Sequence, residues 1–81
     1  MVRRKPAGQR HVTEDELAAR LGSALRAARL AQNIDQLTLA RQAGVSETAL
    51  RNLESGGGTV RTLIRVIRAL GREGWLDSVR P

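Results

Sequence analysis

The stretch QLTLARQAGVSETALRNLE, residues 36–54, decides the fold that this sequence predicts. It holds two short segments with the apolar spacing of helices, and only Gly44 and Val45 separate them. Gly44 can adopt a positive φ at little cost and so turn the chain sharply. Ala40 is small enough to let two helices cross closely. The stretch therefore predicts two helices joined at a tight corner, with the start of the second helix projecting outward.

The sequence before this corner predicts a long first helix. Thr13 and Glu16 have the spacing of a capping box, in which each side chain accepts a hydrogen bond from the other residue's backbone amide. The helix should run to about Gln32, after which Asn33 suits a left-handed cap. The expected inward face consists of Leu17, Leu21, Leu25 and Ala28, with Ala24 beside them.

The remaining segments predict four more helices and no strand, because no run sustains an alternation of apolar and polar residues. The expected helices are residues 36–43, 46–55, 59–70 and 72–79. Asp35 and Ser46 stand where a side-chain oxygen can cap the first two of these helices, Thr59 opens the third, and Gly71 ends it. The predicted fold class is therefore all-α, a compact bundle of five helices.

The length and the charge distribution predict one small domain behind a basic arm. The chain has 81 residues, and we place the domain at residues 13–81. Four of the fourteen Lys and Arg residues lie within the first ten positions, so the arm at residues 1–12 carries most of the net charge of +6. Two interpretations of the arm remain open, an electrostatic contact with a polyanion and a solubilising or cloning-derived extension.

Residue types that the sequence lacks argue against several classes of function. Cysteine is absent, which excludes disulfides and thiolate metal sites. The one histidine, His11, lies in the arm and no serine has a plausible base nearby, so we expect no metal, no cofactor and no enzymatic activity. No apolar run approaches the roughly 20 residues of a membrane span. Acidic residues follow the basic start, so we expect no signal peptide.

The side chains expected to point outward from the second helix of the corner suit DNA. Arg51 can donate two hydrogen bonds to guanine, and Asn52 can make a paired contact with adenine. Ser46 and Thr48 can bond phosphates or bases. Glu47 can accept a hydrogen bond from cytosine or repel phosphates. The alternative for Arg51 is an ion pair with Glu47, one turn earlier on the same helix.

Two further side chains have structural interpretations. Glu54 is expected to pair with an arginine such as Arg20 or Arg26 rather than to contact DNA. Trp75 is the only aromatic residue, and it is expected to close the core or a dimer seam.

The extended stretch QLTLARQAGVSETALRNLESG, residues 36–56, resembles the helix-turn-helix of the Cro and phage-repressor family, also called XRE. The family pattern is met by Gln36, Leu39-Ala40, Ala43-Gly44-Val45-Ser46, Leu50 and Leu53-Glu54-Ser55-Gly56. The resemblance extends from about Leu17 to Leu76, and it implies a lambda-repressor-like domain.

This resemblance implies a sequence-specific transcriptional regulator, acting as a repressor, that binds double-stranded DNA at a palindromic operator as a homodimer. Gln36 should clamp a phosphate, and the loop at residues 56–58 with Arg61 should meet the DNA backbone. The implied DNA-binding residues are Gln36, Ser46, Glu47, Thr48, Arg51, Asn52 and Arg61. The resemblance also implies a cytoplasmic protein of bacterial or phage origin that associates with the nucleoid.

A second function remains open. Small proteins of this family often act as antitoxins, which bind a toxin protein and repress their own operon. The segment LGREGWLDSVRP, residues 70–81, resembles regulators that accompany kinase-type toxins. Its apolar residues Trp75, Leu76 and Val79 are, together with Leu37, candidates for a dimer surface.

Overall fold

Each α-helix begins at a side-chain cap, and three of these four caps, at Thr13, Asp35 and Ser46, are predicted from the sequence. In this computed structural model, which describes residues 12–79, the Thr13 hydroxyl accepts from the Glu16 amide at 3.0 Å, and Glu16 Oε1 accepts from the Thr13 amide at 3.2 Å. Asp35, Ser46 and Thr59 cap the next three helices by accepting from the amide three residues later. The elements are α1 (Glu14–Ala31), α2 (Gln36–Ala43), α3 (Glu47–Glu54), α4 (Val60–Leu70) and a 3-10 turn, η2 (Glu73–Leu76).

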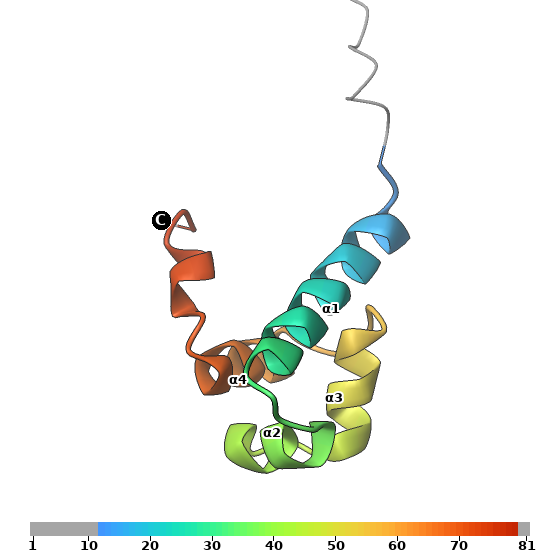
Figure 1. Cartoon of the computed structure of the whole chain (residues 1–81). Coiled ribbons are helices and arrows are strands. Elements are labelled where there is room, and N and C mark those ends of the chain that lie inside the picture. Colours follow the sequence, from blue (N-terminus) through green and yellow to red (C-terminus); the bar gives the residue numbers. More distant parts are fainter. Residues whose placement is uncertain (1–11, 80–81) are drawn as a thin grey trace, which may run out of the picture.

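The predicted all-α class is confirmed for the described residues. Figure 1 shows α2 at the base of the domain, α3 rising beside it, and α1 running diagonally above both. None of the helices between residues 12 and 79 has the length and apolar character needed to cross a membrane. The basic arm predicted at residues 1–12 lies outside the described residues except for Val12.

The corner between α2 and α3 forms as predicted. Gly44 has a φ of 73° and a ψ of 33°, in the left-handed region that side chains disfavour. The amide of Val45 donates to the carbonyl of Ala40 at 3.0 Å and so closes the end of α2. The chain turns sharply at this corner, and Ser46 and Thr48 at the start of α3 are exposed to solvent.

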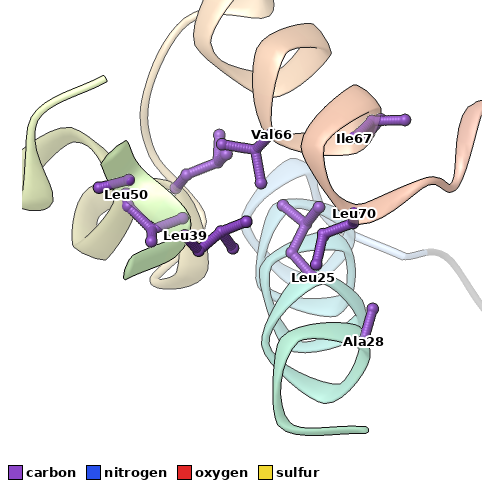
Figure 2. Packing of buried hydrophobic residues seen from close by; sticks show 9 residues of the cluster. Leu25, Ala28, Leu39, Leu50, Val66, Ile67 and Leu70 are labelled. Carbon is purple, nitrogen blue, oxygen red and sulfur yellow. The ribbon is translucent and has the colours of Figure 1, made fainter. Parts of the chain in front are cut away.

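The core lies between the four α-helices, and each of them supplies at least one fully buried aliphatic side chain (Figure 2). The buried core residues are Leu25, Ala28, Leu39, Ala40, Leu50, Leu53, Val66, Ile67 and Leu70. Full burial of one large aliphatic side chain contributes about 1.5–3 kcal/mol. The small domain therefore depends on few side chains, and α3 is held to it mainly by Leu50 and Leu53.

The predicted inward face of α1 is wrong at its amino-terminal half. Leu17 and Leu21 are 51% and 39% exposed, whereas Gly22, Leu25 and Arg29 are buried. The physical reason is that α3 packs directly against the glycine: a Cβ atom at Gly22 would lie 2.5 Å from the carbonyl oxygen of Glu54. Leu21, the residue before this glycine, lines an open pocket with Leu53 and Leu63 and stays partly exposed.

The predicted fifth helix at residues 72–79 is not confirmed, because the chain forms only the short η2 turn there. Arg72 makes no side-chain cap for this turn, and Gly74 in its middle disfavours a longer helix. Trp75 is 40% exposed and does not belong to the core, while its neighbour Leu76 packs against the core. The core role considered for Trp75 is therefore not what the structure has.

Candidate nucleic-acid interface

The outward face of α3 carries most of the predicted DNA-binding residues. Leu50 and Leu53 anchor the opposite face in the core, so Thr48, Arg51 and Asn52 are exposed. The side chains of Thr48 and Asn52 make no hydrogen bond within residues 12–79. They are therefore available to an external partner.

Ser46 and Arg61 lie outside α3, at its N-cap and on α4. The hydroxyl of Ser46 accepts from the amide of Ala49 at 3.0 Å, so it serves first as the cap of α3. It keeps its own proton to donate to a phosphate or a base. Arg61 is exposed in the first turn of α4 and forms no ion pair among the described residues. It is separate from the side-chain contacts that link α2 to α3.

Arg51 is held in place by two acceptors. Its Nη2 donates to Glu47 Oε2 at 2.9 Å, and its Nε donates to Gln36 Oε1 at 3.3 Å. The predicted alternative, an ion pair between Arg51 and Glu47, is thus present. The Arg51 side chain is 59% exposed, and exposed pairs contribute little to stability. The pair consequently orients the guanidinium, but the stability of the fold depends little on it.

A buried ion pair joins α1 to the end of α3. Arg29 Nε donates to Glu54 Oε2 at 2.8 Å and its Nη2 donates to Glu54 Oε1 at 3.2 Å, with the two side chains 8% and 5% exposed. Arg29 Nη1 also donates to the carbonyl of Ile34 at 3.0 Å. Glu54 is therefore structural, as predicted, but its partner is Arg29 rather than Arg20 or Arg26.

The sequence contains one signal for the burial of Arg29 that hydrophobic spacing alone does not show. Arg29 lies four residues after Leu25 and seven after Gly22, which places all three on one helical face. A charged residue on a buried face requires a buried counter-charge. Glu54 is the acidic residue that the packing of α3 against Gly22 brings to this face.

Gln36 joins the buried pair to the exposed arginine. Its Nε2 donates to Glu54 Oε1 at 3.1 Å, while its Oε1 accepts from Arg51. It is the first residue of α2, where free backbone amides can bind an anion, and it is half-buried. The structure thus brings Gln36, Glu47 and Arg51 together, with Glu54 beneath them.

Asp35 adds a negative charge at the start of α2. The backbone amide of Thr38 donates to Asp35 Oδ1 at 2.7 Å, and this bond holds the pKa of the carboxyl below its ordinary value, with Arg29 and Arg41 contributing smaller effects. The ionised carboxylate suits the positive end of the helix dipole. The cap therefore stabilises the end of α2 that faces the predicted phosphate contact.

The lowered pKa of Asp35 predicts an acid-dependent loss of stability. A carboxyl whose folded pKa is below its unfolded value, about 3.9, stabilises the fold above that value and stops doing so as pH falls through the folded pKa. We expect urea unfolding of Asp35→Asn, which keeps a capping oxygen, to depend less on pH below about 4 than that of the wild type. Identical pH profiles for the two proteins would contradict this role of Asp35.

The described residues offer no metal site: between residues 12 and 79, no three His, Cys, Asp or Glu side chains are grouped so that they could hold an ion. The predicted DNA-binding residues carry hydrogen-bond donors and acceptors and lie on α2, α3, its N-cap and the first turn of α4. Such a surface suits the phosphates and base edges of DNA.

The comparison with known families agrees with this geometry. A family model described as helix-turn-helix matches residues 25–74, which contain α2, the corner, α3 and α4. No curated protein matches the chain. The matched region also includes the buried Arg29–Glu54 pair and every predicted DNA-binding residue. The chain therefore belongs to the helix-turn-helix family of DNA-binding proteins, the family of Cro and the phage repressors.

Proposed function

We propose that this protein is a transcriptional repressor that binds a palindromic operator as a homodimer. The observation that carries the proposal is the exposed polar face of α3. The opposite, apolar face of this helix is buried in the core, and the helix begins directly after the corner at Gly44. A helix presented in this way fits the major groove of B-DNA, which is about 12 Å wide. In the proposed complex, α3 reads base edges and the start of α2 faces the backbone.

Each predicted contact has a physical role in this proposal. The guanidinium of Arg51 binds guanine, and the carboxamide of Asn52 binds adenine. Gln36 and Arg61 bind phosphates on either side of α3, which sets the register of the helix without reading sequence. Glu47 accepts from the amino group of cytosine or limits binding to sequences that tolerate its charge.

The homodimer is supported by apolar surface at the carboxyl-terminal end of the described chain. Trp75 and Val79 are exposed there, and Leu76 beside them reaches the core. A second copy that covers these side chains places two α3 helices against one side of the duplex, with half-sites about 34 Å apart. The toxin partner suggested by this same segment stays a prediction, because no contact in the structure favours it over a second copy.

Replacing Arg51 with alanine tests the reading role of α3. Binding sites are first selected from a random duplex library with the wild-type protein. For the selected sequence, we expect Arg51→Ala to lose about 1–3 kcal/mol of discrimination at one base pair, roughly a 5- to 150-fold change in the affinity ratio. Titrations of matched and single-substituted duplexes at constant salt measure this ratio.

A variant without residues 1–10 is the control for general electrostatic attraction. It should bind all duplexes more weakly, with a shallower dependence on salt and an unchanged preference for sequence. Selected sites with two inverted half-sites support the dimer, whereas a single half-site would overturn that part of the proposal. If the wild type selects no sequence at all, the repressor function itself is wrong.

A further inference from the structure

The hydrogen bonds between α2 and α3 point to a coupling within the interface, and this inference rests on the proposed function. We propose that Gln36 is a positioning residue for Arg51, so that the predicted phosphate clamp and the predicted base reader act as one unit anchored on buried Glu54. Gln36 then affects which base pair is preferred, in addition to its own contact with the backbone.

The first argument is the orientation of the Gln36 carboxamide. This group has one oxygen acceptor and two N–H donors. The oxygen accepts from Arg51 Nε at 3.3 Å, and the nitrogen donates to Glu54 Oε1 at 3.1 Å. Reversing the amide would set its N–H group against the arginine and its oxygen against the carboxylate, so the observed orientation is fixed. One N–H remains for a phosphate.

The second argument is that two hydrogen bonds restrain the guanidinium of Arg51 while other N–H donors of the group stay unused. Gln36 accepts from Nε and Glu47 accepts from Nη2, which uses two of the five N–H donors of the guanidinium. Nη1 makes no hydrogen bond with any residue between 12 and 79. A side chain already held in a binding orientation loses less conformational entropy when it meets a base.

The third argument is the rigidity of the anchor. The side chain of Glu54 is 5% exposed, and both of its carboxylate oxygens accept from Arg29. Arg29 is fixed in turn by the carbonyl of Ile34 at 3.0 Å. The position of Gln36, and through it that of Arg51, is therefore set by the core.

The experiment replaces Gln36 with methionine, which keeps the length of the side chain and removes both hydrogen bonds. Its matched control is Arg61→Gln, which removes a predicted phosphate contact that has no link to Arg51. At the base pair where Arg51→Ala loses discrimination, we expect Gln36→Met to lower the affinity ratio about fivefold. Arg61→Gln should weaken binding to all sequences and leave that ratio unchanged.

The double variant Gln36→Met/Arg51→Ala completes the cycle. It should discriminate at that base pair no worse than Arg51→Ala alone, because the side chain that Gln36 positions is then missing. Unchanged discrimination in Gln36→Met, or equal and independent losses in the cycle, would overturn the coupling while the repressor function stands. If the wild-type protein shows no sequence preference, the proposed repressor function itself is wrong.

A measurement on the free protein keeps the proposal testable if Gln36→Met does not fold. Arg51 is exposed, so Arg51→Ala retains the fold, and we expect it to shift the side-chain amide resonances of Gln36 in the NMR spectrum. The exposed control Asn52→Ala, on the next residue of α3, should leave them in place. Gln36 resonances that do not respond to Arg51→Ala would contradict the coupling.

Discussion

Replacing Glu54 with alanine is expected to destabilise the domain by about 3–5 kcal/mol, because it leaves the charge of Arg29 buried without a partner. The two side chains are only 8% and 5% exposed, so water cannot replace the lost carboxylate. Small domains have total stabilities near the lower end of about 5–15 kcal/mol. Urea denaturation followed by circular dichroism should therefore show Glu54→Ala largely unfolded or close to its midpoint in buffer.

The matched control is the exposed ion pair on the same helix. Glu47→Ala removes the partner of Arg51, whose side chain is 59% exposed, and should cost less than about 1 kcal/mol. The double variant Arg29→Met/Glu54→Leu should recover much of the lost stability, since an apolar pair needs no counter-charge. Equal losses of unfolding free energy in Glu54→Ala and Glu47→Ala would show that the buried Arg29–Glu54 pair does not hold α3 to α1.

Replacing Gly22 with alanine is expected to destabilise the domain by about 1–3 kcal/mol through overpacking. The added Cβ would lie 2.5 Å from the Glu54 carbonyl oxygen and 2.8 Å from that of Leu53, both of which are backbone atoms. In an unhindered helix, the same change stabilises by about 1 kcal/mol, so the sign of the effect identifies the contact. Thermal unfolding measures it directly.

Ser23→Ala is the control for helix propensity, because Ser23 is the next residue of α1 and is exposed. It should be neutral or stabilise by a few tenths of a kcal/mol. Since α1 must move away from α3 in Gly22→Ala, we also expect this variant to bind the selected operator more weakly than Ser23→Ala does. A Gly22→Ala protein as stable as the wild type would contradict the close approach of α1 and α3.

The features of the fold that can be predicted from the sequence arise from interactions between residues close together in the chain. The capping box of Thr13 and Glu16 spans three residues, and the caps at Asp35, Ser46 and Thr59 have the same reach. These interactions exist within one turn of chain, so the residue types and their spacing suffice to locate them.

Helical spacing predicts the wrong inward face for the first half of α1, because it defines parallel stripes on a helix but not which stripe packs against the rest of the domain. Leu17 and Leu21 form a more apolar stripe than Gly22 and Arg29 do. The burial of Gly22 depends on its lack of a side chain, which permits a close helix contact and adds nothing to hydrophobic periodicity. Arg29 lies on the same face of α1 as Gly22, so it is buried too, and Glu54 supplies its counter-charge.

Residue types and local spacing are enough to predict the four α-helices, the corner at Gly44 and the polar residues on the outer face of α3, but they also predict a fifth helix where the chain forms only the η2 turn. The connection of Arg29, Glu54, Gln36 and Arg51 into one hydrogen-bonded set depends on the packing of the helices. Their hydrogen bonds join residues 25, 18 and 15 positions apart in the chain. Such contacts depend on how the helices cross, and that crossing is set by the packing of Gly22 and the core leucines rather than by any local pattern.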